Sequence, residues 1–311
     1  MRFYIITILS LGICLNTFAQ LSAEDFSYYK SIEDSLKKIQ ARVFFSKKES
    51  NRFEANKQFL ALWTSVLKDE KSLYYPFDSI KEISRLTSPD KKFRIITWDL
   101  LKEDETHVYF GFLQVNNSKT TKKGLFKKET VSEYNVFQLL DRSATVKTPE
   151  NYVSGPDKWF GMLYYDVIKS SDEFYTLIGW DGNDKLTQKK FVDVLYFKPD
   201  GTPQFGKDVF KYPGKFAKRL MFEYSSEVAM SLKYNKDRKQ IIMSHLAPRD
   251  PDPTLETQYQ YYGPDGSYDA MYMKKDKWIY EPAIDIRKDK DKTDNVKAPE
   301  PKKQSPVYKP K

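Results

Sequence analysis

Residues 174–197 read FYTLIGWDGNDKLTQKKFVDVLYF, and this stretch shows the pattern that most of the chain follows. Two runs rich in Tyr, Phe, Ile and Val, Phe174–Trp180 and Phe191–Phe197, have the composition of β-strands. Between them lies Asp181-Gly182-Asn183-Asp184, whose residue types favour a turn. Because no helix-length segment separates the two runs, we expect the strands to pair antiparallel.

The same composition recurs over residues 71–286, where short aromatic and β-branched runs alternate with polar connections. Pro199-Asp200-Gly201 and Pro264-Asp265-Gly266 have the residue order of type I turns, and the second is expected to close a hairpin. Further candidate strands are Phe93–Leu101, Val108–Val115, Tyr134–Leu140, Trp159–Ile168, Arg219–Tyr224, Val228–Tyr234, Gln240–Leu246, Gln258–Tyr262, Tyr268–Met273 and Trp278–Ile284. We therefore expect a mainly β domain over residues 71–286, with an antiparallel meandering sheet.

Three arrangements of this sheet remain open, which are a sandwich, a barrel and a propeller. A strand that ends in Trp-Asp occurs twice, at Trp98-Asp99 and at Trp180-Asp181. Such an internal echo is what a propeller of short blades would produce, although no period of roughly 40–50 residues is visible.

Residues 20–70 follow a different pattern, with apolar residues at the three- and four-residue spacing of an α-helix. The two stripes predict a helical hairpin packed on the sheet, so the chain is α+β overall. Ser22 with Asp25, and Ser46 with Glu49, resemble capping boxes at the beginning of the two helices. The stripes are Tyr29, Ile32, Leu36, Ile39 and Val43 in the first helix and Phe53, Leu60, Trp63 and Leu67 in the second.

Residues 1–19 have the features of a secretory signal peptide. Arg2 supplies a positive charge, Phe3–Leu15 is apolar, and Thr17-Phe18-Ala19 places small residues at the cleavage positions before Gln20. We therefore expect an exported chain, periplasmic, associated with the outer membrane or secreted, without a transmembrane segment once it is cleaved.

The single cysteine, Cys14, lies inside this segment, so we expect the mature chain to hold no thiol and no disulfide. A lipid anchor on Cys14 is the alternative, but Ile13 before it is larger than lipoprotein signals prefer. An exported chain without disulfides must be stabilised by its core alone.

Positive charge is in excess but spread along the chain, with 52 Lys and Arg against 43 Asp and Glu and a formal net charge of +9. Residues 287–311 are rich in Lys, Asp and Pro and nearly free of apolar residues, which predicts a disordered tail. The chain has no basic helix or stacking motif, so we do not expect a nucleic-acid partner. An envelope polysaccharide or a partner protein fits an exported chain better, and diffuse positive charge would attract an anionic one.

The first group of candidate binding residues follows the strand at 174–180 and comprises Trp180, Asp181, Asn183 and Asp184. The indole could stack on a sugar ring, and the carboxylates could meet a calcium ion. The spacing departs from the EF-hand pattern at Lys185, and a plain turn explains these residues equally well.

The second group comprises His245, Asp250 and Asp252, which lie in and beside a Pro-rich loop. One imidazole and two carboxylates could bind a divalent cation, although a rigid solvated loop explains them as well. The chain has only two His, and its one Cys lies in the expected signal peptide, so we expect no metal and no cofactor.

Motifs for catalysis are weak. Gly201–Asp208 has the spacing of a phosphate-binding loop, but Asp208 stands where a hydroxyl residue is needed, and the segment reads as a hairpin. His107 follows three acidic residues and is interpreted as part of a charged turn. A catalytic pair of carboxylates for glycoside hydrolysis remains an alternative, because many Asp and Glu are present. No particular pair stands out in the sequence.

The stretch 174–197, together with Ser88–Asp99 and Tyr261–Ala270, resembles uncharacterised exported bacterial proteins over most of residues 80–286. The resemblance carries no known activity, so it transfers no functional residue to this chain.

Three functions from different classes follow as hypotheses. The first is an exported, non-catalytic β-protein that binds an envelope component or a partner protein. The second is an extracytoplasmic hydrolase that acts on glycan or peptide with paired carboxylates. The third is an envelope assembly factor that acts through its helical hairpin. An exposed apolar face on residues 25–67 would support this third hypothesis.

Protein recovered from the native host should begin at Gln20, because Ala19 ends the signal-peptide cleavage site. Intact-mass measurement decides this. A mass that still includes residues 1–19, or a lipid on Cys14, would contradict the expectation.

Overall fold

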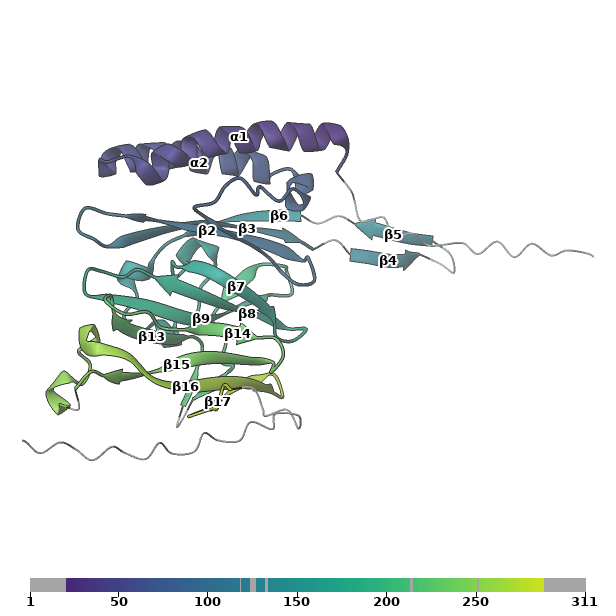
Figure 1. Cartoon of the computed structure of the whole chain (residues 1–311). Coiled ribbons are helices and arrows are strands. Elements are labelled where there is room, and N and C mark those ends of the chain that lie inside the picture. The colour runs from purple at the N-terminus through teal and green to yellow at the C-terminus, as the bar shows by residue number, and fades with distance from the viewer. Residues whose placement is uncertain are drawn as a thin grey trace, which may run out of the picture.

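The computed structural model describes residues 21–117, 119–123, 127–131, 134–212, 215–250 and 252–287. The chain folds into a stack of four layers, in which a helical hairpin lies on the first of three β-sheets that pack face to face (Figure 1). The predicted class, mainly β with an N-terminal helical hairpin, is confirmed. Each of these sheets is open, so the sandwich-like arrangement applies and the described residues form no closed barrel. The predicted signal peptide, with Ala19 and Gln20, lies outside the described residues.

The helical layer consists of α1 (Ala23–Phe45) and α2 (Glu49–Leu67). The capping box at Ser22 and Asp25 is confirmed, since the Ser22 hydroxyl accepts from the Asp25 N–H at 3.0 Å. The second predicted capping box is wrong: Ser46 is the C-cap of α1, and Lys48 begins α2 without a side-chain cap. The helix α1 continues to Phe45 and α2 begins only at Glu49, so Glu49 is the first residue of its helix and not the third, as a capping box with Ser46 would require. No helix in the described part of the chain is both long and apolar enough to cross a membrane.

Sheet 1 lies directly beneath the helices and has the strand order β1-β2-β3-β6. Its strands, all antiparallel, are β1 (Ser84–Thr87), β2 (Phe93–Leu101), β3 (His107–Asn116) and β6 (Tyr134–Leu140). Between β3 and β6 the chain forms β4 (Lys119–Lys123) and β5 (Lys127–Val131), which pair with each other beside the stack (Figure 1).

Sheet 2 is the middle sheet and is built on the hairpin of residues 174–197. Its strands are β7 (Leu163–Lys169), β8 (Phe174–Asp181), β9 (Thr187–Phe197), β10 (Pro203–Phe205) and β13 (Leu220–Ser225). Two strands pair with the same edge of β9: β13 pairs with its first half, and β10 pairs with its last three residues. Segment 201–208 therefore contains a hairpin strand and opens no helix, which agrees with the rejection of a phosphate-binding loop.

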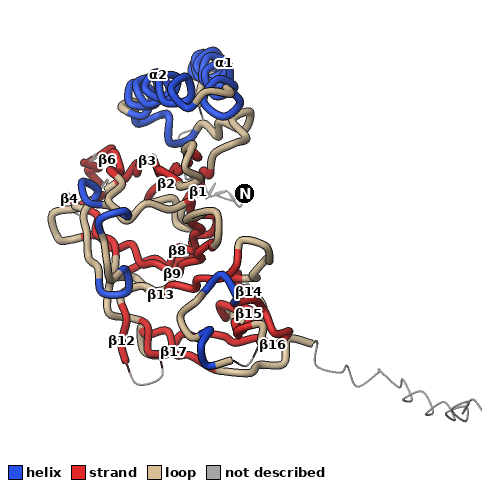
Figure 2. Tube along the Cα trace, turned by 90° about the vertical axis from the view of Figure 1, so that its left-hand side faces the viewer, coloured by secondary structure: helices blue, strands red, loops and turns tan. Residues whose placement is uncertain are grey.

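Sheet 3 has the order β12-β11-β17-β16-β15-β14. Its strands are β11 (Phe210–Tyr212), β12 (Lys215–Ala217), β14 (Leu232–Asn235), β15 (Gln240–Pro248), β16 (Tyr262–Lys274) and β17 (Lys277–Glu281). The β11–β12 hairpin precedes β13 in the chain yet joins sheet 3 by a parallel pairing of β11 with β17. The chain thus passes from sheet 2 to sheet 3 and back before it completes sheet 2, which interlocks the two layers (Figure 2).

Each interface between layers is a separate hydrophobic core. Between the helices and sheet 1, Phe59 and Trp63 pack with Trp98, whose indole N–H donates to the Asn56 amide oxygen at 2.8 Å. Between sheets 1 and 2 lie mainly aromatic side chains, and between sheets 2 and 3 a mixture that includes Met230, Met243 and Met271. The aromatic richness of the sequence is therefore divided among three cores.

One predicted hairpin is wrong. Residues 258–261 form no strand, because Tyr259–Tyr261 is a single 3₁₀ turn; β16 begins at Tyr262, and Asp265-Gly266 lies within it. There the register with β15 shifts, and Gly266 takes φ +93° in the resulting bulge. The Pro-Asp-Gly sequence does supply the positive φ expected of it, but a bulge needs this conformation as much as a turn does.

The C-terminal boundary also differs slightly from the expectation. Beyond β17, the Ile284 N–H donates to the Tyr268 carbonyl at 2.7 Å, and Arg238 donates to the carbonyls of Asp285 and Arg287 at 2.7 and 2.8 Å. The chain is therefore held on sheet 3 as far as Arg287, and the rest of the predicted tail, 288–311, lies outside the described residues.

A buried ion pair anchors the return of the chain to sheet 2. Arg219, just before β13, and Asp193 on β9 are both fully buried, with Nε and Oδ1 3.0 Å apart. The Tyr164 hydroxyl donates to the same carboxylate at 2.8 Å, and Arg219 donates to the Pro149 carbonyl at 3.0 Å. Arg219 Nη2 also donates to Asp193 Oδ2 at 3.1 Å, whereas Nε is paired in charge but makes no hydrogen bond. The two buried charges therefore compensate each other, and removing one would leave the other without its counter-charge.

Asp193→Leu should lower the free energy of unfolding by about 3–5 kcal/mol, because it leaves the Arg219 guanidinium buried without its partner. The double variant Asp193→Leu with Arg219→Met should lose clearly less, since no charge remains uncompensated. Urea denaturation of the parent, Asp193→Leu, Arg219→Met and the double variant measures these values. A double variant that loses the sum of the two single effects would contradict this account.

Candidate functional site

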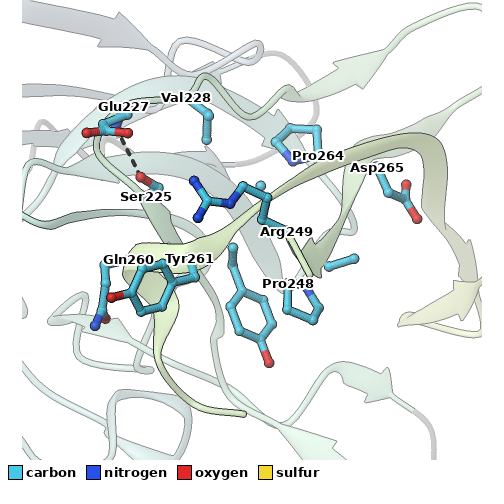
Figure 3. Close-up of a pocket in the computed structure, with 12 residues that line it drawn as sticks. Ser225, Glu227, Val228, Pro248, Arg249, Gln260, Tyr261, Pro264 and Asp265 are labelled. Carbon is cyan, nitrogen blue, oxygen red and sulfur yellow. Dashed lines mark hydrogen bonds between the residues drawn. The ribbon is translucent and has the colours of Figure 1, made fainter. Parts of the chain in front are cut away.

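Two clefts open at the end of the stack where the β8–β9 turn lies. Cleft A, of about 580 Å³, lies between the ends of sheets 1 and 2. It is lined by Lys102, Asp104, Thr106, His107, Val108, Tyr109, Asp141, Ser143, Ala144, Val146, Pro149, Phe160, Asp181, Asn183 and Lys189. Cleft B, of about 330 Å³, lies between the end of β13 and the β15–β16 pair (Figure 3). Cleft A contains two residues of the first predicted group, Asp181 and Asn183, and is the candidate functional site.

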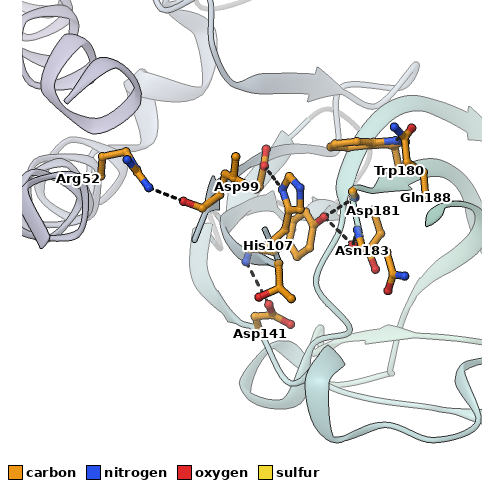
Figure 4. Close-up of polar contacts among 12 residues, drawn as sticks. Arg52, Asp99, His107, Asp141, Trp180, Asp181, Asn183 and Gln188 are labelled. Atoms are coloured by element: carbon orange, nitrogen blue, oxygen red, sulfur yellow. Dashed lines mark hydrogen bonds and ion pairs between the residues drawn. The ribbon is translucent and has the colours of Figure 1, made fainter. Parts of the chain in front are cut away.

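Asp181 ends β8 and is nearly buried at the base of cleft A. Its Oδ1 accepts from the Tyr109 hydroxyl at 2.7 Å and from the Asn183 N–H at 2.8 Å (Figure 4). Burial raises the pKa of this carboxyl, although these two hydrogen bonds act in the opposite direction. Burial and the neighbouring Asp181 likewise raise the pKa of Tyr109, so its hydroxyl stays a hydrogen-bond donor.

Asp141 follows β6 and holds three backbone segments together beside Asp181. Its Oδ1 accepts from the N–H groups of Ser143 at 2.8 Å and Gly161 at 3.1 Å, and its Oδ2 accepts from the Tyr109 N–H at 3.0 Å. A side chain at Gly161 would overlap the carboxylate, so the absence of a Cβ there is a condition of the arrangement. Asp141 thus fixes one wall of cleft A by accepting from main-chain donors.

His107 begins β3 and faces the turn after β8. Its Nδ1 lies 2.7 Å from Oδ2 of Asp99, the residue that forms part of the opposite strand β2. The imidazole ring lies parallel to the Tyr109 ring and meets the Trp180 ring edge to face, with centroids 6.3 and 5.5 Å away. It therefore links the ends of sheets 1 and 2 (Figure 4).

Gly182 makes this contact possible, since a Cβ on it would overlap Nε2 of His107. Gly182 does not have a positive φ, so the need for glycine at this position comes from the close approach of His107. The residue of the turn in the left-handed conformation is Asn183, with φ 52°. The sequence predicted a turn here, and the structure adds that its glycine accommodates a neighbouring sheet.

The rest of the first predicted group shapes the turn. Asn183 donates to the Thr187 hydroxyl at 2.6 Å and accepts from Lys189 Nζ at 2.8 Å, and Asp184 accepts from the N–H groups of Leu186 and Thr187. Lys189 itself lines cleft A. Asp184 therefore stabilises the turn from outside the cleft, and Asn183 connects the turn to the cleft.

Trp180 does not line cleft A. Its indole N–H donates to Gln188 Oε1 at 3.1 Å on the neighbouring strand, so the ring is held against the sheet next to His107. Of the four residues in the first predicted group, the structure thus brings Asp181 and Asn183 into the cleft and leaves Trp180 and Asp184 as its supports.

The second predicted group is dispersed. His245 Nδ1 lies 2.8 Å from Oδ2 of Asp269, and this hydrogen bond raises the pKa of the imidazole. Asp252 instead accepts from the Thr254 N–H at 2.8 Å as the cap of a 3₁₀ turn, and Asp250 pairs with its neighbour Arg249. Across the described ranges, no three His, Cys, Asp or Glu side chains gather in a way that could hold a metal ion.

Sequence reasoning missed His107, Tyr109 and Asp141. His107 was interpreted as part of a charged turn, although it starts a strand and contacts the neighbouring sheet. Tyr109 and Asp141 have no local signature, because their partners lie 72 and 20 residues away in the chain. The signal that could have helped is the pair of small residues, Gly161 and Gly182, at positions where a side chain of another layer approaches.

The chain matches no protein-family model, no curated protein and no solved structure.

Gly182→Ala should lower the free energy of unfolding by about 1–3 kcal/mol, because its methyl group would overlap the His107 ring. The matched control is Gly263→Ala, whose Cβ would meet Val228 at 3.4 Å, an ordinary contact. In a His107→Ala background, the cost of Gly182→Ala should largely disappear. Urea denaturation of the four variants measures this, and an unchanged cost in that background would show that the strain lies in the turn itself.

Proposed function

We propose that this chain is an exported, non-catalytic binding protein and that its ligand is a polysaccharide of the cell envelope. The observation that carries the proposal is cleft A, a polar hollow whose side chains are held in place by bonds to three separate segments of the fold. Rigid, pre-positioned polar groups are what a binding site needs to recognise a flexible ligand at low entropic cost.

The lining of cleft A suits a polyhydroxylated ligand. The Ser143 and Thr106 hydroxyls and the Lys189 ammonium provide hydrogen-bonding groups of both kinds, and Val146, Pro149 and Phe160 give an apolar surface. Two Lys and three Asp line the cleft, so it is not a strongly basic anion site. A mixture of polar groups over an apolar floor matches the alternating hydroxyl and C–H surfaces of a sugar ring.

The same contacts favour holding a ligand over cleaving it. Both oxygens of Asp141 accept from backbone N–H groups, and one oxygen of Asp181 already has two donors. The His107 ring is fixed between Asp99 and Gly182. These groups act as structural supports of the cleft wall, and a general base needs a free lone pair directed at the substrate.

A hydrolase acting on glycan or peptide is the second candidate, and one observation favours it. Burial raises the pKa of Asp181, and a carboxyl with a raised pKa inside a cleft is the usual form of a general acid. Release of reducing ends from the bound polysaccharide, abolished in Asp181→Asn, would replace the binding proposal with this one.

The third hypothesis, an assembly factor acting through the helices, has less support. Phe26, Tyr28 and Phe45 are exposed on α1, but the last two are seventeen residues apart. At 3.6 residues per turn the three side chains point to different sides of α1, so they form no single apolar face.

Ala144→Trp should abolish binding of polysaccharide purified from the native host's envelope, because Ala144 is exposed on the lining of cleft A and an indole there fills the space. Thr145→Trp is the control, since Thr145 is the exposed neighbour that does not line the cleft. Co-sedimentation with the insoluble polysaccharide measures binding. Equal retention of the two variants, or no binding by the parent protein, would overturn the proposal.

A further inference from the structure

Cleft B is a second site of similar character. Its polar lining comprises Ser225, Glu227, Arg249 and Gln260, and two tyrosines, Tyr261 and Tyr262, present aromatic surface (Figure 3). Val228, Pro248 and Pro264 give an apolar floor. The charged residues are one Arg against one Glu and one Asp, so cleft B, like cleft A, is close to balanced in charge.

The aromatic side of cleft B is held by the backbone beneath it. The Arg249 N–H donates to the Tyr261 carbonyl at 2.8 Å, which ties the two sides of the β15–β16 connection together. The side chain of Arg249 extends over the cleft between Ser225 and Pro264 in Figure 3. Tyr261 keeps 39% of its surface exposed, so its ring is available for stacking on a sugar.

The β8–β9 turn borders cleft A and is hydrogen-bonded to the segment that lines one side of cleft B. On one side, Asn183 and Lys189 line cleft A. On the other, the Ser226 N–H donates to the Leu186 carbonyl at 3.0 Å and its hydroxyl to the Lys185 carbonyl at 2.7 Å, next to Ser225 and Glu227 of cleft B. Leu186, in the turn itself, is 58% exposed. The clefts are therefore adjacent along the end of the stack, with an apolar side chain between them.

We propose that one extended, uncharged stretch of polysaccharide occupies both clefts and crosses the β8–β9 turn over Leu186. This inference rests on the function proposed above and adds the class of ligand, a chain long enough to span two sites. Joining two weak sites by one ligand makes the second contact intramolecular, which raises affinity without any new type of contact.

The test uses the native host's envelope polysaccharide, cut by partial acid hydrolysis and separated into oligosaccharides of increasing length. Isothermal titration of the full chain should show a rise in affinity of about 100-fold over the lengths at which a chain bound in cleft A first reaches cleft B. Oligosaccharides shorter than that should bind weakly and with constant affinity.

Tyr261→Ala should remove the rise and leave the affinity of cleft A for short oligosaccharides unchanged, because Tyr261 lines cleft B alone. Tyr74→Ala is the matched control, since Tyr74 is 38% exposed and lines neither cleft. Val228→Trp, which fills cleft B from an exposed position, repeats the test if Tyr261→Ala lowers the melting temperature.

The outcomes separate the two proposals. An affinity that does not depend on length, or a Tyr261→Ala protein that behaves as Tyr74→Ala does, overturns the two-cleft inference and leaves binding at cleft A intact. If no oligosaccharide and no intact polysaccharide binds the parent protein, the proposed function fails and the inference fails with it.

Discussion

The middle sheet of the stack is enclosed on both faces, and the other layers depend on it. Successive residues of a strand point to opposite faces. In β8 and β9, Leu177 and Phe191 pack toward sheet 1, while their neighbours Ile178 and Val192 pack toward sheet 3. Such strands have to be apolar at nearly every position, which is the reason that residues 174–197 contain near-continuous apolar runs. Sheet 1 meets the same requirement, with Ile95 and Ile96 in different cores.

Two buried arginines stand out inside this stack, and each has several polar partners. Arg94 is buried in sheet 1 and donates to Gln114 and to the carbonyls of Tyr75 and Ser72, and burial lowers its pKa to about 10. Two of these partners, Ser72 and Tyr75, belong to the segment that leads from the helices to the first strand, and Arg219 lies where the chain returns to sheet 2. In both places a buried cation fixes the path of a connecting segment, because moving the segment would leave the charge without acceptors.

The clefts arise where the stacking ends. Apolar runs stop at the strand ends and polar turns begin, so the spaces between layers are lined there by turn residues instead of core side chains. What makes cleft A well defined is that Asp141 and Asp181 accept hydrogen bonds from different segments, and that the His107 ring reaches across to Gly182. These contacts hold the ends of the sheets in place, so the side chains that line cleft A keep fixed positions relative to one another.

The sequence alone determined the elements of local origin. The apolar stripes predicted both helices, the capping box at Ser22 followed from its own neighbours, and β2 and β6 lie where the aromatic and β-branched runs predicted them. Local pattern also identified Asp181 and Asn183 as polar residues at a turn. It misplaced Gly266, because a Pro-Asp-Gly sequence supplies a positive φ to a turn and to a bulge alike.

Only the tertiary structure decided how these elements stack and which polar residues meet. The open stack, the return of the β11–β12 hairpin to sheet 3 and the bond between Tyr109 and Asp181 all join residues far apart in the chain. Strand periodicity reports that a face is buried but not which layer covers it, so sandwich, barrel and propeller could not be distinguished from the sequence. Cleft A was invisible for the same reason: Asp141 and His107 acquire their roles from partners brought to them by the packing of one sheet on another.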